Sequence, residues 1–323
     1  MNKKCIGCGI TLQTKNKNKL GFISEAKYQE GNYCERCFKV INYNEFIPVN
    51  LENINEYIIN EVNEKAKLVF FLIDLLNINE ETIETFNKIK TKKYLVISKS
   101  DVIPKSIKEE KLNSWLKEIY NITEEVFFIS AKKKYNINKI FKLMEEHDCI
   151  ESYVLGFTNS GKSSLINTIN AGVATITTSN MLNTTIDFIK MNIDGKTIID
   201  SPGFNYQKTL FDNQDFDLIK RMNPRKFLKP TTLQTKDNLT MKIENLFSLK
   251  VNNKNSLTFY ISNDINITKF FNYSKEEDYL ELEIPENSDL VIKGLGFINI
   301  KKECILNISS NIKDLIEIRK SMF

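Results

Sequence analysis

Histidine and tryptophan occur only once each in this chain of 323 residues, as His147 and Trp115. A lone histidine excludes metal sites made of several histidines and argues against a Ser-His-Asp triad. The lone tryptophan lies in a helical pattern, which favours a place in the core or at an interface over a base-stacking platform. The sequence therefore directs attention away from histidine chemistry.

Long hydrophobic runs are also missing. The longest, Leu68 to Ile73, is far shorter than the roughly 20 apolar residues of a membrane helix and predicts a buried strand instead. The opening residues, MNKKCIGCGI, lack the hydrophobic stretch and small-residue cleavage site of a secretory signal. We therefore expect a cytoplasmic protein without a membrane partner.

Net charge is small, since 45 basic and 41 acidic residues leave +4. The whole excess lies in residues 1–47, which makes this segment a weak candidate for contact with an acidic or nucleic-acid partner. A plain lysine-rich surface is the alternative interpretation. The apolar fraction of 41% and the charged fraction of 27% are typical of a globular chain, here of about two domains.

Four of the six cysteines form two CxxC pairs, Cys5 with Cys8 and Cys34 with Cys37. In a reducing compartment such pairs bind metal more often than they form disulfides, and two CxxC turns can close a tetrahedral Zn²⁺ site. A redox motif and two unrelated cysteine pairs are the alternatives. We predict a four-cysteine zinc finger over residues 1–47, whose thiolates would offset part of the positive charge there.

Residues 48–228 alternate between helical and strand-like patterns. Apolar residues at three- and four-residue spacing predict a helix over Asn50–Lys65, and short apolar runs predict strands. This alternation predicts an α/β domain with a mainly parallel sheet covered by helices on both faces. The expected strands are Leu68–Asp74, Tyr94–Ser98, Val126–Ser130 and Ser152–Gly156, and the other expected helices are Glu80–Lys90, Ser106–Tyr120, Ile137–His147 and Ser163–Asn170.

From about Pro230 the pattern changes to strand-like pieces, which predict a separate β-rich domain over residues 229–323. Its aromatic residues Phe259, Tyr260 and Phe297 could stack on RNA bases, although core packing is the commoner role of such residues. The expected strands are Leu257–Ile261, Tyr279–Ile284, Leu290–Ile292, Gly296–Ile300 and Cys304–Ile308.

A phosphate-binding loop is predicted where residues 156–163 read GFTNSGKS, after a strand and at the start of a helix. In this GxxxxGK[ST] pattern the glycines let backbone N–H groups surround a phosphate. Lys162 neutralises the phosphate oxygens and the Ser163 hydroxyl reaches Mg²⁺. The other residues expected to bind phosphate are Asn159, Ser160, Gly161 and Ser164.

A DxxG pattern follows the strand Lys196–Ile199, with Asp200 at its start and Gly203 at its end. In nucleoside-triphosphate switches this Asp contributes to the Mg²⁺ shell and the Gly N–H contacts the γ-phosphate. A loop between the two motifs contains Thr184 and Thr185, either of which can supply the switch threonine to Mg²⁺. We favour Thr185 for this role.

Two guanine-recognition elements lie upstream of the phosphate-binding loop. Ser98–Asp101 (SKSD) resembles the NKxD element, in which Lys99 and Asp101 would meet the base and the carboxylate accepts two hydrogen bonds that adenine cannot offer. Ser130, Ala131 and Lys132 resemble the SAK element, whose backbone N–H meets guanine O6. Ser98 replaces the usual Asn, which ties this loop to the phosphate-binding loop, so guanine affinity could be reduced. If the protein were an ATPase, the match of Asp101 to the guanine-recognition element would be a coincidence.

The order of these motifs is circularly permuted, because the guanine elements precede the phosphate-binding loop. Parallel strands still present all of them at one edge of the sheet. This order, together with the N-terminal CxxC pairs and the segment IKGLGF at 292–297, resembles the YqeH family of circularly permuted ribosome-biogenesis GTPases. The resemblance implies a GTP- and Mg²⁺-dependent factor in assembly of the small ribosomal subunit, with ribosomal RNA and protein as partners. We expect it to be a monomer whose C-terminal module contacts RNA.

Phe204 follows the DxxG pattern, where many GTPases have the glutamine that positions the attacking water. The resemblance places the chain among GTPases with a hydrophobic residue here, which implies slow hydrolysis completed by a partner or a monovalent cation. Asn159 matches the asparagine that coordinates K⁺ in cation-activated relatives, unless it only caps the loop. Arg221 and Arg225 are candidate charge stabilisers, although structural roles are commoner for such arginines.

Two other functions are consistent with the sequence. One is a permuted GTPase with a different assembly target. The other is a non-enzymatic scaffold that binds zinc and nucleotide, which Ser98 and Phe204 favour. The intact motif residues argue against a scaffold; these are Lys162, Ser163, Asp200 and Gly203. The family often has Pro-Gly before the switch threonines, where this chain has Leu182 and Asn183, so the alignment there is open by one residue.

Overall fold

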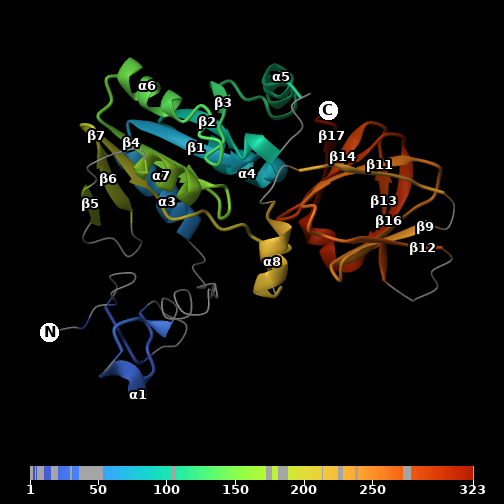
Figure 1. The fold of residues 1–323 in the computed structure, drawn as a ribbon, viewed down its shortest axis with the longest axis horizontal. Helices are drawn as coiled ribbons and strands as arrows, with labels where there is room; N and C mark the ends of the chain where they lie inside the picture. Colours follow the sequence, from blue (N-terminus) through green and yellow to red (C-terminus); the bar gives the residue numbers. More distant parts are fainter. Residues whose placement is uncertain are drawn as a thin grey trace.

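The computed structural model describes residues 3, 5, 11–15, 21–29, 31–35, 54–102, 107–171, 177–180, 188–212, 214–224, 228–236, 239–271 and 278–322. Within this part of the chain an α/β domain, residues 54–224, lies beside a β domain, residues 228–322 (Figure 1). None of the helices in these residues is long and apolar enough to cross a bilayer.

A seven-stranded mixed sheet forms the centre of the α/β domain, in the order β3-β2-β1-β4-β7-β6-β5. The five strands from β3 to β7 are parallel, while β6 and β5 continue the sheet antiparallel. This confirms the prediction of a mainly parallel sheet. The strands are β1 Leu68–Asp74, β2 Lys92–Ser98, β3 Val126–Phe128, β4 Glu151–Gly156, β5 Thr177–Asn180, β6 Ile189–Ile193 and β7 Lys196–Asp200.

Helices cover both faces of this sheet, which explains why every residue of β1 is buried. One face packs against α3 (Ile54–Lys65), α4 (Glu80–Asn87) and α5 (Glu109–Tyr120). The other packs against α6 (Asn138–Glu146) and α7 (Lys162–Asn170). Alternate residues of β1 supply the two cores, as their period of two requires.

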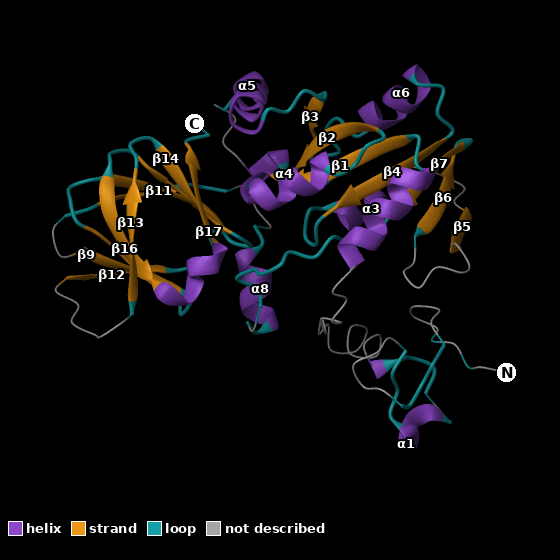
Figure 2. Cartoon of the chain, turned by 180° about the vertical axis from the view of Figure 1, so that it is seen from behind, coloured by secondary structure: helices purple, strands orange, loops and turns teal. Residues whose placement is uncertain are grey.

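Two antiparallel five-stranded sheets form the β domain. Their orders are β12-β9-β10-β16-β13 and β17-β14-β15-β11-β8, and residues of both sheets share one hydrophobic core. A short helix, α8 (Phe216–Met222), precedes them, as Figure 2 shows. The strands are β8 Thr231–Gln234, β9 Leu239–Ile243, β10 Phe247–Val251, β11 Ser256–Ile261, β12 Ile267–Phe271, β13 Tyr279–Ile284, β14 Ser288–Ile292, β15 Gly296–Ile300, β16 Cys304–Ser309 and β17 Ile316–Lys320.

In the second of these sheets the strands β14 and β15 are buried on both faces. Leu290 and Ile298 face the core of the β domain, while Val291 and Phe297 belong to the core of the α/β domain. The two domains therefore share hydrophobic packing, and alternate residues of β14 and β15 serve different domains. Burial on both faces explains why consecutive residues of β14 and β15, such as Leu290 and Val291, are apolar.

A buried arginine joins the two domains. The guanidinium of Arg319 lies 4.8 Å from the ring centroid of Trp115 and 5.0 Å from that of Phe297, and it also donates to the carbonyl of Ile78. Asp289, fully buried, lies 3.5 Å from Arg319 and accepts hydrogen bonds from the side chain of Asn299 and from the backbone N–H of Met322. Trp115 is therefore an interface residue, as its sequence pattern favours.

The expected elements agree with the structure, with end shifts of a few residues. The helix predicted from Ser106 begins at Glu109, and the strand predicted to Ser130 ends at Phe128. Five strands of the β domain were not predicted, namely β8, β9, β10, β12 and β17, because each is a short segment with polar residues interspersed. Phe259 and Phe297 are buried and Tyr260 stacks on Phe297, so these aromatics pack in the protein interior, the commoner role.

Candidate nucleotide-binding site

The phosphate-binding loop connects β4 to α7 at the carboxyl edge of the sheet. Gly161 caps α7 with φ at 93°, a conformation that L side chains rarely adopt. At Gly156 a Cβ atom would lie 2.6 Å from the carbonyl oxygen of Leu72, so the close approach of the neighbouring strand requires glycine. The fold thus explains both glycines of the predicted motif. Asn159 and the first-turn residues Ser163 and Ser164 are exposed at this edge.

The phosphate side of the site consists of the phosphate-binding loop and the DxxG segment, and Lys162 and Asp200 are its charged centre. Lys162 is only 9% exposed, and burial lowers the pKa of its ammonium while the Asp200 carboxylate opposes the shift. Burial raises the pKa of Asp200, and Lys162 opposes that shift. Among the described side chains, one carboxylate oxygen of Asp200 and the hydroxyl of Ser160 are buried without a hydrogen-bond partner. Buried polar atoms of this kind fit a site that a phosphate and its cation complete.

The DxxG segment packs directly on the phosphate-binding loop. Phe204 N–H donates to the carbonyl of Gly156 at 3.1 Å, and Thr158 N–H donates to the carbonyl of Phe204 at 2.9 Å. A Cβ atom at Gly203 would lie 3.1 Å from the methyl group of Thr158. The structure therefore brings the predicted Gly203 beside the predicted phosphate-binding loop.

Phe204 is fully buried, with its ring centroid 5.5 Å from that of Phe71 and 5.6 Å from that of Phe157. Its side chain belongs to the core of the domain. A side chain held there cannot reach an attacking water, whatever its polarity. The departure from glutamine is thus a packing feature as well as a chemical one.

The base side of the site consists of the two predicted guanine-recognition elements, and Ser98 connects it to the phosphate-binding loop. Its hydroxyl donates to the backbone carbonyl of Ser160 at 2.5 Å, and β2 places Ser98 in register with Asp74 of β1. A Cβ atom at Gly161 would lie 3.5 Å from the Ser98 hydroxyl oxygen. Serine therefore makes the connection between the two loops that asparagine makes in the usual NKxD element.

The two guanine elements also contact each other. The Ser130 hydroxyl donates to a carboxylate oxygen of Asp101 at 2.6 Å, and it accepts from Lys133 N–H at 3.1 Å. The Ala131 carbonyl accepts from the hydroxyl of Thr168 on α7 at 3.3 Å. The structure thus brings together Lys99, Asp101, Ser130, Ala131 and Lys132 at the same edge as the phosphate-binding loop.

Asp74 is a site residue that the sequence reasoning missed. It ends β1, is 4% exposed, and forms an ion pair with Lys99 at 2.9 Å. One feature of the sequence could have identified it: Asp74 is a single acidic residue at the carboxyl end of an otherwise apolar strand. That strand pairs with the strand that carries the guanine element. Such a position faces the ligand edge in a parallel sheet.

Several predicted residues lie outside the described part of the chain. These are the switch residues Leu182, Asn183, Thr184 and Thr185, the arginine Arg225, and two of the four cysteines, Cys8 and Cys37. Arg221 is described and has a structural role, because it pairs with Glu244 at 2.5 Å and donates to the carbonyl of Asp264 at 3.2 Å.

The other two cysteines lie together. Cys5 and Cys34 are 1% and 2% exposed and pack against Leu12 and Ile23. The backbone N–H of Cys34 donates to the Sγ of Cys5 at 3.1 Å. One cysteine of each CxxC pair is thus brought to the same place, which fits a metal site that uses both pairs.

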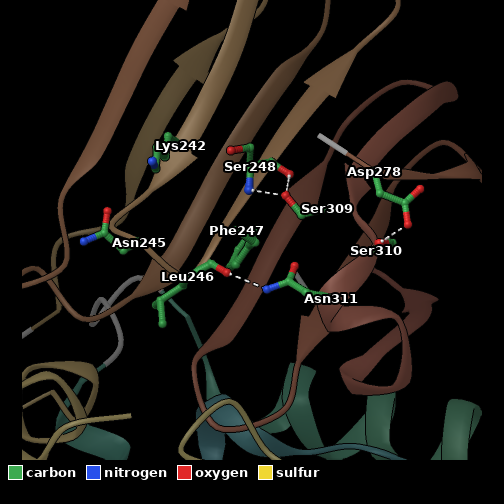
Figure 3. Close-up of a pocket in the computed structure, with 9 residues that line it drawn as sticks. All are labelled: Lys242, Asn245, Leu246, Phe247, Ser248, Asp278, Ser309, Ser310 and Asn311. Carbon is green, nitrogen blue, oxygen red and sulfur yellow. Dashed lines mark hydrogen bonds between the residues drawn. The ribbon is translucent and has the colours of Figure 1, made fainter. Parts of the chain in front are cut away.

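A cavity of about 310 Å³ lies in the β domain, away from the nucleotide edge (Figure 3). Several of its polar groups bond to one another. Ser248 N–H donates to the hydroxyl of Ser309, Asn311 donates to the carbonyl of Leu246, and the hydroxyl of Ser310 donates to Asp278. The lining residues therefore bind the turns of the domain together and form no catalytic cluster.

The chain is similar to several known proteins. Residues 53–209 match the RsgA GTPase family. The chain is 32% identical to the protein YqeH of Bacillus subtilis over 92% of both chains, and 30% identical to the tRNA modification GTPase MnmE of Mycoplasma genitalium over 51% of this chain and 38% of that one. The crystal structure of YjeQ from Thermotoga maritima is 22% identical with a TM-score of 0.32, covering 44% of this chain and 49% of the other.

The fold and the edge of the sheet thus define a domain with circularly permuted motifs that matches the RsgA GTPase family over residues 53–209. Within that class, the chain belongs to the YqeH family.

Proposed function

We propose that the protein binds and hydrolyses GTP through residues at the carboxyl edge of the α/β sheet. The observation that carries this proposal is the hydrogen bond from Ser98 to the Ser160 carbonyl, because it joins the base loop to the phosphate loop despite their permuted order. Lys99 and Asp101 would recognise guanine, with the backbone of Ser130, Ala131 and Lys132 at O6. The residues expected to surround the phosphates are Asn159, Ser160, Gly161, Lys162, Ser163, Ser164 and Gly203.

Magnesium fits this site because one carboxylate oxygen of Asp200 is buried and has no hydrogen-bond partner among the described residues. The carboxylate also interacts electrostatically with the buried Lys162. Ser163 and Thr185 would hold the ion directly, with Asp200 contributing to its shell. Magnesium would neutralise the charge that develops on the phosphates. Hydrolysis would be slow, since Phe204 is packed in the core and cannot orient water. Asn159 would coordinate the K⁺ that stimulates it.

Zinc would be held by Cys5, Cys8, Cys34 and Cys37. Support comes from the burial of Cys5 and Cys34 and from the N–H donated to the Cys5 sulfur. The ion would stabilise the finger over residues 1–47, which is too small to form a large core of its own. We propose the same division of the remaining chain, into a GTPase domain over 48–228 and a β-rich domain over 229–323.

The cellular role that we propose is assembly of the small ribosomal subunit in the cytoplasm, with the protein acting as a monomer on ribosomal RNA and protein. The β domain offers a surface for RNA on the sheet β12-β9-β10-β16-β13. One cross-strand row of that sheet contains Phe270, Thr240, Lys250, Asn307 and Glu281, on the opposite side from the core residues Met241, Leu249 and Ile308. A lysine and an aromatic ring in one row of a sheet, here with Thr240 between them, suit a single-stranded nucleic acid.

Nucleotide binding to the purified chain with Mg²⁺ tests the first proposal. We expect guanine nucleotides to bind more tightly than adenine nucleotides. Asp101→Asn should transfer the preference to xanthine nucleotides, because an amide donor complements the 2-oxo group of xanthine. Binding without a base preference in the wild type would favour the non-enzymatic scaffold.

Ribosome association tests the cellular role. Co-sedimentation with small and large subunits, in GDP and in a non-hydrolysable GTP analogue, should show GTP-dependent binding to the small subunit. Lys250→Glu should weaken the complex without changing nucleotide affinity. Association with the large subunit alone would indicate a permuted GTPase with a different assembly target.

A further inference from the structure

We infer that Asp74 positions the guanine-binding loop and that the β domain holds Asp74 in place through Asn77. The inference rests on the proposed function, because it takes Lys99 and Asp101 to lie against a guanine base. Asp74 acts through Lys99, so it is a positioning residue.

The carboxylate of Asp74 is held by three donors. One oxygen accepts from Lys99 Nζ at 2.9 Å and from Asn77 Nδ2 at 3.0 Å. The other accepts from Leu76 N–H at 3.1 Å, which caps a short 3₁₀ turn after β1. Because the group is 4% exposed, water cannot replace these partners, and the carboxylate has one orientation.

Lys99 needs such support. Its backbone φ is +56°, in the left-handed region that costs an L-residue roughly 1–2 kcal/mol. A lysine in this conformation is retained where its surroundings hold it. The ion pair with Asp74 fixes the far end of the side chain, and the neighbouring Ser98 is fixed by its bond to Ser160.

Asn77 carries the connection onward to the β domain. Its Oδ1 accepts from the backbone N–H of Gly294 at 3.0 Å, while its Nδ2 donates to Asp74. Gly294 lies in the turn between β14 and β15, with φ at 92°, and a Cβ atom there would lie 3.2 Å from the ring of Phe211. The turn is therefore closely fitted to its surroundings and gives Asn77 a fixed partner.

The amide of Asn77 is suited to this relay because it accepts on one side and donates on the other. An aspartate could still accept from Gly294 but would place a second carboxylate against Asp74. A leucine has a similarly branched side chain, although a larger one, and would make neither bond. One line of hydrogen bonds thus runs from the β domain to the base loop through Gly294, Asn77, Asp74 and Lys99, of which only Lys99 is partly exposed.

The test measures the affinity of the full chain for GDP by titration of a fluorescent GDP analogue. Asp74→Asn should weaken binding about tenfold, since it removes a charge-assisted bond to Lys99. Lys99→Met should weaken it at least as much. The double variant should be no weaker than Lys99→Met alone, because Asp74 acts through Lys99. Additive losses would overturn the inference.

Asn77→Leu is the second variant and tests the link to the β domain. It should weaken GDP binding about threefold, since it removes a neutral bond from Gly294 and a bond to the Asp74 carboxylate, and only part of that loss reaches the base loop. Glu118→Gln is the matched control, because it breaks the exposed interdomain pair with Lys320 and leaves the relay intact. We expect its GDP affinity to stay within about twofold of wild type, as for other surface substitutions. Equal effects of these two variants would overturn the relay.

Asp101→Asn separates failure of the inference from failure of the proposed function. If it leaves the base preference unchanged, the guanine site itself is misplaced. If it transfers the preference to xanthine while Asp74→Asn and Asn77→Leu both bind GDP as wild type does, only the positioning role fails. Should Asp74→Asn prove unfolded by thermal melting, Asn77→Leu decides the inference on its own.

Discussion

The base side and the phosphate side of the nucleotide site differ in how far the protein satisfies its own polar groups. On the base side, Asp101 accepts from Ser130, and Lys99 pairs with Asp74. On the phosphate side, Ser160 and Asp200 each retain a buried oxygen without a partner among the described residues. The base side is therefore preformed, whereas the phosphate side is completed by the phosphates and their cation.

The largest effect is expected on the phosphate side. Lys162→Met removes the cation that would neutralise the phosphate oxygens and should weaken GTP binding about 100-fold. The nucleotide-free variant should melt no lower than wild type, because burial already disfavours the charged lysine. Calorimetric titration and thermal melting measure the two effects. A variant that melted lower and still bound GTP normally would show that Lys162 is structural.

Asp200→Asn should separate stability from function. Burial raises the pKa of Asp200, so the folded state disfavours the carboxylate, and its stability cost appears as the pH rises above the ordinary value of 3.8. At pH 7 the free energy of unfolding of the variant should be higher than that of wild type, because the amide has no charge to bury. This advantage should shrink as the pH falls toward that ordinary value.

Urea unfolding at several pH values measures that difference, and GTP titration with and without Mg²⁺ measures the function. The variant should lose the gain in GTP affinity that Mg²⁺ gives the wild type. A pH-independent stability difference would contradict the proposed burial of an ionised group.

A smaller effect is expected where the two sides meet. Ser98→Ala removes the hydroxyl that bonds to the Ser160 carbonyl and should weaken GDP binding about fivefold, equivalent to roughly 1 kcal/mol. Ser98→Thr retains the hydroxyl and is the matched control. Equal affinities of Ser98→Ala and wild type would show that the two loops are held together by other contacts.

The smallest effect is expected at Lys132. Its side chain is exposed, and the proposed contact to guanine O6 uses backbone N–H groups. Lys132→Ala should therefore change GDP affinity by less than about twofold, as expected for a substitution at the surface. A loss as large as that of Asp101→Asn would mean that the side chain itself contacts the nucleotide.

Much of this comparison could be predicted from the sequence. The strands β1, β2 and β4 were recognisable as apolar runs, and each is followed by polar residues that a parallel sheet brings to one edge. Motif spacing therefore identified Lys162, Asp200 and Asp101 as candidates. Short edge strands such as β8 and β12 were not recognisable, because their alternation of polar and apolar residues is weak over so few positions.

By itself the sequence determined the order of the motifs, the α/β and β-rich division, and the residue types that suit phosphate, guanine and metal. These properties depend on local spacing, which the printed order of residues contains. Only the tertiary structure showed that Phe204 is packed in the core, that Arg319 lies between Trp115 and Phe297, and that Asn77 meets Gly294. Contacts between residues far apart in the chain depend on how whole sheets and helices pack, and no short segment of the chain encodes them alone.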